Sequence, residues 1–172
     1  FGTVPSLHAY FLRAGQSKEP IDYSIERIRE GRNFLTRRVT ARHGVAVVYD
    51  CHSIRSEIPF LFPGTLPVFS IGTDGGTTCS PALSQLAHTA CQGSDYPTVL
   101  NRRFKGGWTT RHYGRPDEGV HAIQMELAQR AYLDAEAAPW DYDRTRADRL
   151  RAVLGPILTG LDRLARSGAL AA

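Results

Sequence analysis

The clearest strand pattern in the chain is an apolar run that ends in a group of polar residues. Val45–Tyr49 is rich in valine and is followed directly by residues 50–55, DCHSIR. A continuous apolar run of this kind is typical of a parallel strand that is covered on both faces. Side chains alternate along a strand, so Asp50 and His52 share one face and Cys51 lies on the other. Because ligands gather beyond the carboxyl ends of such strands, we expect the chemistry at residues 50–55.

A second alternating segment covers residues 119–127. Its apolar residues Ile123, Met125 and Leu127 fall on one face, and Gln124 and Glu126 fall on the other. The pattern predicts a second strand, which carries the Glu126 carboxylate inward.

The remaining pattern after residue 45 predicts helices and short connections around these two strands. Three prolines make residues 57–67 a loop, and residues 70–78 are a glycine-rich, polar segment that either wraps an anion or turns the chain. Ser80 and Pro81 open a helix, with a capping hydroxyl followed by a proline in the first turn. Residues 97–101 predict a short strand, and apolar residues at three- and four-residue spacing predict a long helix over 143–167.

The loop predicted over residues 102–116 suits the capture of an anion, because it combines glycines with basic side chains. Arg111 is the first candidate for holding a carboxylate, since a guanidinium can bind a carboxylate through two parallel hydrogen bonds. The alternative is a surface ion pair. Arg55 is a second candidate. His112 and His121 have weaker claims, because each fits a structural hydrogen-bonding role equally well.

The first 44 residues have a different character. Residues 6–12, 21–28 and 33–40 alternate as three strands, with a turn at Glu30 and Gly31, which predicts a β-meander. Eight Lys and Arg stand against four acids in residues 1–44, while residues 45–172 hold thirteen of each. We find no nucleic-acid-binding motif around these arginines, so a solvated sheet face explains them better than a nucleic-acid partner does.

The composition indicates a cytoplasmic protein with one core. The 172 residues suffice for a domain, and no apolar run approaches the ~20 residues that span a bilayer. Three cysteines without C-x-x-C spacing predict reduced thiols in the cytosol. Because the first residue is Phe1, we expect the chain to be a piece of a longer reading frame.

Three blocks after residue 43 closely resemble the carboxyl-terminal part of the N-formylglutamate amidohydrolase (deformylase) family. They are YDCHSIRSEIPFLFPGTLPVFSIGT, NRRFKGGWTTRHYGRP and GVHAIQMELAQRAY, and the resemblance covers about residues 43–166. It implies an α/β fold with a zinc-peptidase-like (phosphorylase/hydrolase-like) mixed sheet and flanking helices, here incomplete. It also implies hydrolysis of N-formyl-L-glutamate to formate and glutamate in histidine degradation. In the chemistry that the resemblance implies, His52 is one zinc ligand, Glu126 moves the proton of the attacking water, and Arg111 holds the carboxylates of the substrate.

The blocks SLHAYFLRAG and PIDYSIERIREGRNFLTRRVTAR resemble the amino-terminal hot-dog repeat of the acyl-CoA thioesterase II family. We therefore predict two parts, a thioesterase-like β segment over residues 1–42 and a deformylase-like domain over residues 43–172. A gene fusion, a recombination of truncated genes and an error of sequence assembly all produce such a join.

Two functions stay open on this sequence: a truncated and impaired deformylase, and a non-catalytic remnant or thioesterase-like fragment. The family's other metal ligands come from its amino-terminal half, so we expect weak zinc binding and very slow or undetectable turnover. The small molecule N-formyl-L-glutamate is the expected partner, with no nucleic acid and no membrane. Unpaired strand edges in the first segment predict self-association.

Overall fold

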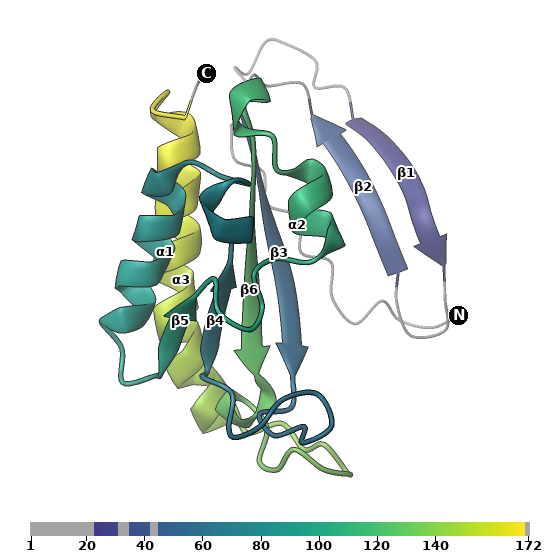
Figure 1. Ribbon diagram of the computed structural model, residues 1–172, viewed down its shortest axis with the longest axis vertical. Helices are drawn as coiled ribbons and strands as arrows, with labels where there is room; N and C mark the ends of the chain where they lie inside the picture. The colour runs from purple at the N-terminus through teal and green to yellow at the C-terminus, as the bar shows by residue number, and fades with distance from the viewer. Residues whose placement is uncertain (1–22, 31–34, 42–44, 171–172) are drawn as a thin grey trace.

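The computed structural model describes residues 23–30, 35–41 and 45–170, which form two separate sheets (Figure 1). The first sheet is an antiparallel pair, β1 (Tyr23–Glu30) and β2 (Leu35–Ala41), with Tyr23 opposite Ala41 and a register shift between Arg27 and Arg29. Two strands of the predicted meander are thus present. The third, residues 6–12, and the turn at Gly31 lie outside the described residues.

The second sheet is mixed and has the strand order β3-β6-β4-β5. The central strand β6 runs parallel to β3 and antiparallel to β4, and β5 runs parallel to β4. The four strands are β3 (Ala46–Ile54), β4 (Phe69–Gly72), β5 (Thr98–Leu100) and β6 (Val120–Ala128). Residues 46–54 and 120–128 therefore lie side by side in one sheet.

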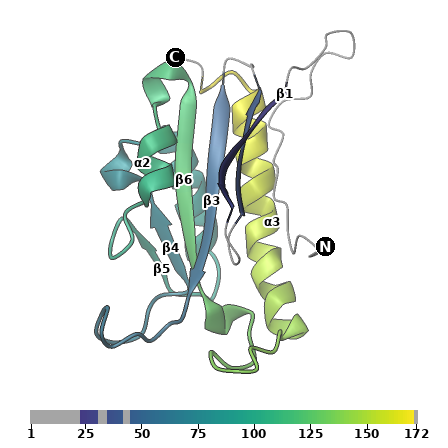
Figure 2. The ribbon, with the colours of Figure 1, turned by 90° about the vertical axis from the view of Figure 1, so that its right-hand side faces the viewer.

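Helices cover both faces of this sheet, which confirms the α/β architecture. α1 (Pro81–Gln92) and α3 (Arg144–Arg166) lie together on one face, and the short α2 (Trp108–Tyr113) lies on the other (Figures 1 and 2). Single-turn 3-10 helices occupy Asp74–Gly76, Pro116–Glu118 and Gln129–Ala131.

The core lies between the sheet and the pair α1 and α3. It is built from apolar side chains that alternate out of β4 and β6 and from the inward stripes of both helices, among them Ile71, Leu83, Ile123, Met125, Ile157 and Leu161. Ser80 caps α1 and Asp143 caps α3 through side-chain oxygens that accept backbone N–H groups. The predicted start of α1 at Ser80 and Pro81 is confirmed, and the predicted helix over 143–167 is confirmed within one residue at each end.

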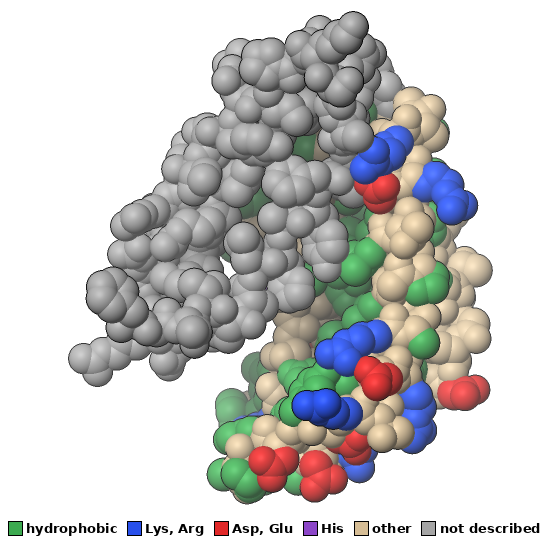
Figure 3. Space-filling view, turned by 180° about the vertical axis from the view of Figure 1, so that it is seen from behind, with side chains coloured by type: hydrophobic (Ala, Val, Ile, Leu, Met, Phe, Trp, Pro, Cys, Tyr) green, Lys and Arg blue, Asp and Glu red, His purple; other side chains and the backbone are tan. Residues whose placement is uncertain are grey.

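The outer surface of α3 is polar, as expected for a helix that packs on a sheet. It carries the ion pairs Arg151–Asp148 at 2.7 Å and Arg166–Asp162 at 2.8 Å. In the view from behind, basic and acidic side chains are interspersed over the described surface (Figure 3). Across the described ranges, no helix combines the length and the apolar character needed to cross a membrane.

Two features of the sheet differ from the sequence prediction. β3 is the edge strand of the sheet among the described residues rather than an inner, buried one: it is half-buried from Ala46 to Asp50 and exposed from Cys51 to Ser53. The segment 70–78 is not only a turn, because Phe69–Gly72 is a fully buried inner strand. A four-residue strand that contains serine and glycine is too short and too polar for periodicity to reveal.

The predicted loop over residues 102–116 also differs, because it contains the helix α2. The loop over residues 57–67 is confirmed. Its side chains Ile58, Phe62 and Leu66 form a second, smaller core cluster with Ile54 at the end of β3 and Phe104 before α2.

Candidate functional site: a polar face on the central strands

Polar side chains line the face of β3 and β6 that is turned toward α2. The two strands are in parallel register, with Asp50 opposite Gln124 and His52 opposite Glu126. Because side chains alternate along a strand, these four residues share one face, and the core residues Ile123 and Met125 share the other. The strand register therefore makes His52 and Glu126 direct neighbours.

Glycines hold the segment before α2 close against the sheet. A Cβ atom on Gly72 would lie 2.5 Å from the backbone nitrogen of Gly106 and 2.6 Å from the carbonyl carbon of Lys105, so only glycine permits this approach. Gly106 itself has φ +124°, a conformation that L side chains rarely adopt. The amide of Gly107 then donates to the side-chain oxygen Oε1 of Gln124 at 2.5 Å. These contacts place the first turn of α2 over the polar face.

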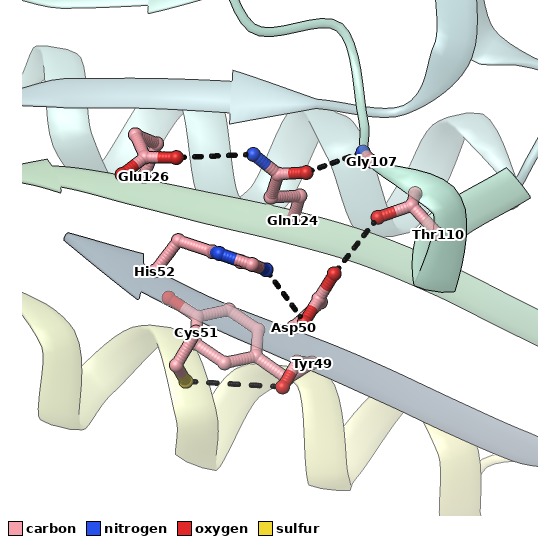
Figure 4. A network of polar contacts seen from close by, with 8 residues as sticks. All are labelled: Tyr49, Asp50, Cys51, His52, Gly107, Thr110, Gln124 and Glu126. Carbon is pink, nitrogen blue, oxygen red and sulfur yellow. Dashed lines mark hydrogen bonds and ion pairs between the residues drawn. The ribbon is translucent and has the colours of Figure 1, made fainter. Parts of the chain in front are cut away.

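A chain of hydrogen bonds joins the polar residues (Figure 4). His52 Nε2 and Asp50 Oδ1 lie 2.9 Å apart, and the hydroxyl of Thr110 on α2 donates to Asp50 Oδ2 at 3.3 Å. Gln124 Nε2 donates to Glu126 Oε2 at 3.4 Å. Both oxygens of Asp50 are thus engaged, while the long bond to Gln124 leaves the Glu126 carboxylate weakly held.

The two central ionisable groups hold protons more tightly than usual. The hydrogen bond to Asp50 raises the pKa of His52, against the opposing effect of partial burial, and the charges of Asp50 and Glu126 raise it further. Burial raises the pKa of Glu126, the charge of His52 lowers it and that of Asp50 raises it. A buried carboxyl beside a histidine can accept a proton and release it again, which is the property of a general acid–base group.

These shifts predict how stability depends on pH. His52 stabilises the fold below its ordinary pKa of 6.5, and this contribution is lost as the pH rises through the raised, folded value. Glu126 also has a raised pKa, so the folded state favours its protonated form, and stability is lost as the pH rises from 4.5 through the folded value. We expect the stability of the wild type relative to Glu126→Gln to fall from pH 4.5 toward pH 8, as measured by urea unfolding. A constant difference would contradict the burial of the carboxylate.

The predicted substrate arginines are not part of the hydrogen-bonded network drawn in Figure 4. Arg111 lies on α2, is exposed, and donates through Nη1 to the carbonyl oxygen of Gly106. Arg55 is exposed and follows directly after the end of β3.

The two weaker histidine candidates have structural contacts. His112 is exposed and stacks on Trp108, with ring centroids 4.1 Å apart. His121 is buried, accepts the Ser80 amide through Nδ1 at 3.2 Å, and contacts the Leu170 carbonyl through Nε2 at 3.2 Å. Both histidines therefore have structural partners.

The cysteines are free thiols, as predicted from their spacing. Figure 4 shows Cys51 on the opposite side of β3 from His52, toward α3, in agreement with strand alternation. Partial desolvation, and then the charge of Asp50, raise the pKa of Cys51 to about 11. Cys51 is therefore a protonated thiol at neutral pH, and it lies on the other face of β3 from His52.

The described residues do not fit a metal centre on their own. Among residues 23–30, 35–41 and 45–170, no three His, Cys, Asp or Glu side chains are grouped so that they could hold a metal ion. His52 Nε2 and both Asp50 oxygens are already hydrogen-bonded. We therefore assign no chemical step to a metal.

Two residues of the network, Thr110 and Gln124, were not predicted as site residues from the sequence, although the strand face of Gln124 was. Gln124 could have been predicted as a site residue, because it stands two residues before Glu126 and so shares its strand face. Thr110 could not have been predicted, because its contact with Asp50 joins residues 60 positions apart in the chain.

Comparison with known proteins agrees with this fold. Residues 33–133 match the family model of N-formylglutamate amidohydrolase, and residues 2–53 match that of the acyl-CoA thioesterase N-terminal domain. The first match covers more than half of the chain. The chain belongs to the N-formylglutamate amidohydrolase family.

Individual relatives support both matches. The chain is 48% identical over 125 residues to the N-formylglutamate deformylase of Pseudomonas aeruginosa, which covers 72% of this chain and 47% of that protein. It is 53% identical over 45 residues to acyl-coenzyme A thioesterase 8 of Mus musculus, which covers 26% of this chain and 14% of that protein. The chain thus spans about half the length of the deformylase.

A solved structure shares the fold. The crystal structure of N-formylglutamate amidohydrolase from Ralstonia eutropha JMP134 superimposes with a TM-score of 0.59 and 24% identity, covering 73% of this chain and 44% of that one. The mixed sheet with its flanking helices is therefore a family fold.

Proposed function

We propose that this protein is a deformylase-like hydrolase that converts N-formyl-L-glutamate and water to formate and L-glutamate. The observation that carries the proposal is the pairing of His52 with Glu126 on adjacent parallel strands, on the polar face under α2. A relative that is 48% identical is a deformylase of the same substrate class. The buried carboxyl and the Asp50–His52 pair are suited to proton transfer during amide hydrolysis.

Glu126 is the proposed acid–base group. It takes a proton from the attacking water as the oxygen adds to the formyl carbon. When the C–N bond breaks, the same carboxyl gives this proton to the leaving amine of glutamate. The raised pKa of Glu126 favours the first transfer, since such a carboxyl accepts a proton more readily than an exposed one does.

His52 is the one zinc ligand that the family resemblance assigns to the described residues. A ligating imidazole is neutral. In the resting chain the ring is held by Asp50.

Arg111 and Arg55 are proposed to bind the carboxylates of the substrate. A guanidinium pairs with a carboxylate through two parallel hydrogen bonds. Arg111 must first release the carbonyl oxygen of Gly106, which its Nη1 contacts. The exposed Arg55 directly follows Ile54, the last residue of β3, which packs against the smaller core cluster.

The direct test is formate release from N-formyl-L-glutamate by the purified chain. We expect slow release that exceeds the rate without protein, with formate and glutamate formed in equal amounts. Equal rates with and without the protein would contradict the proposal.

A second candidate function is that of a thioesterase-like remnant, which the match of residues 2–53 favours. The matched thioesterase segment covers only 14% of the mouse relative. Incubation with an acyl-CoA and a thiol reagent separates an active thioesterase from a deformylase. Thioester hydrolysis releases free coenzyme A, which the reagent detects, whereas hydrolysis of N-formyl-L-glutamate releases no thiol.

Zinc binding is expected to be weak and to depend on His52. A zinc ion at His52 Nε2 must displace the carboxylate of Asp50, and catalytic zinc sites use three protein ligands. After dialysis against zinc and then buffer, we expect well below one zinc per chain, and less still for His52→Ala. His112→Ala is the matched control, because that ring stacks on Trp108 away from the network. One zinc per chain that survives a chelator would contradict this expectation.

A further inference from the structure

Ser70 is a buried serine in the middle of the sheet, next to the proposed acid–base group. It lies on β4, is 1% exposed, and stands directly opposite Glu126 in the antiparallel ladder. Its neighbours Phe69 and Ile71 point into the core. Ser70 therefore points to the other face, which also carries Glu126 and His52.

The hydroxyl of Ser70 has no hydrogen-bond partner in the part of the chain that the structure describes. An unpaired buried hydroxyl destabilises a fold, and most buried polar groups are paired. Replacement by alanine would remove this cost without opening a large cavity. The position is therefore better explained by a partner gained during function than by stability.

Glu126 is the polar group best placed to become that partner. Directly opposed residues of an antiparallel pair have Cβ atoms about 4.5–5.5 Å apart, so their side chains can meet. Within the described part of the chain, the hydrogen bond to the carboxylate of Glu126 is the long one of 3.4 Å from Gln124, which leaves the carboxylate able to turn. Across the sheet, Glu126 is flanked by His52 on β3 and by Ser70 on β4.

We propose that Ser70 is a positioning residue, whose hydroxyl donates a hydrogen bond to the Glu126 carboxylate and aims it at the attacking water. Gln124 then holds the resting orientation, and Ser70 holds the reacting one. The kinetic test of this inference rests on the proposed deformylase function. The inference adds Ser70 to the residues proposed for that function.

The test compares Ser70→Ala, Ser70→Thr and the control Ser84→Ala in the full chain. Ser84 lies on α1, on the opposite side of the sheet, and donates to the Pro81 carbonyl. With N-formyl-L-glutamate, Ser70→Ala is expected to lower kcat about tenfold and to leave KM within about twofold, since one hydrogen bond to a charged group is lost. Ser70→Thr keeps the hydroxyl and is expected to restore most of kcat.

Thermal unfolding supplies a second readout. Ser70→Ala is expected to melt no lower than the wild type, because it removes an unpaired polar atom. A loss of kcat at unchanged or higher melting temperature supports a positioning role. An unchanged kcat, or a raised KM with normal kcat, would overturn it.

Formate release by the wild type keeps the inference separate from the proposed function. If the wild type releases no formate, the proposed function fails, and the inference that rests on it fails with it. If the wild type turns over, a double-mutant cycle in kcat between Ser70→Ala and Glu126→Gln tests the inference by itself. Ser70→Ala should have little further effect on kcat once Glu126 is replaced, and additive effects on kcat would refute the contact.

Discussion

Glu126→Gln is expected to lower formate release by a factor of about 10²–10⁴ while the protein stays folded. Glutamine has nearly the shape of glutamate, so it can keep the contact with Gln124, but it cannot accept the proton of the attacking water. The change also removes a buried ionisable group with a raised pKa. We therefore expect a gain in stability of about 1 kcal/mol at neutral pH, together with the loss of turnover.

The matched control for this variant is Glu118→Gln. Glu118 is an exposed residue whose carboxylate pairs with Arg115 at 3.5 Å, outside the polar face. Glu118→Gln should keep wild-type kcat and KM. Formate release by Glu126→Gln at the rate of this control would remove Glu126 from the reaction.

Gly72→Ala is expected to destabilise the protein by about 3 kcal/mol and to reduce turnover with it. The added methyl group would meet backbone atoms of Lys105 and Gly106 at 2.5–2.6 Å, and backbone cannot move aside as a flexible side chain can. The segment before α2 must then shift. Gln124 would lose its bond from the Gly107 amide, and Asp50 would lose its bond from Thr110.

Gly155→Ala is the control for this substitution. Gly155 lies within α3, and a Cβ atom there would meet nothing within 4 Å. Alanine favours the helix over glycine by up to about 1 kcal/mol, so Gly155→Ala should raise the midpoint of urea unfolding. Equal effects of the two substitutions would show that the close approach at Gly72 has no energetic consequence.

Local alternation was the most informative signal in the sequence. It correctly placed Asp50 and His52 on one face of a strand, with Cys51 on the other. It also gave Glu126 the face opposite to Ile123 and Met125. Periodicity likewise predicted α1 and α3, because caps and apolar stripes depend only on residues a few positions apart. The mixed sheet was predicted from the resemblance to the family, because the alternation of side chains does not show how strands are ordered in a sheet.

Only the tertiary structure decided which residues of different elements meet. Strand register joins residues far apart in the chain, so the pairing of His52 with Glu126, and of Ser70 with Glu126, could not be obtained from either segment alone. The same holds for the edge position of β3, which depends on its neighbours in the sheet rather than on its apolar run. The approach of Gly106 to Gly72 decides where α2 lies, and it is a contact between two backbones that no side-chain pattern records.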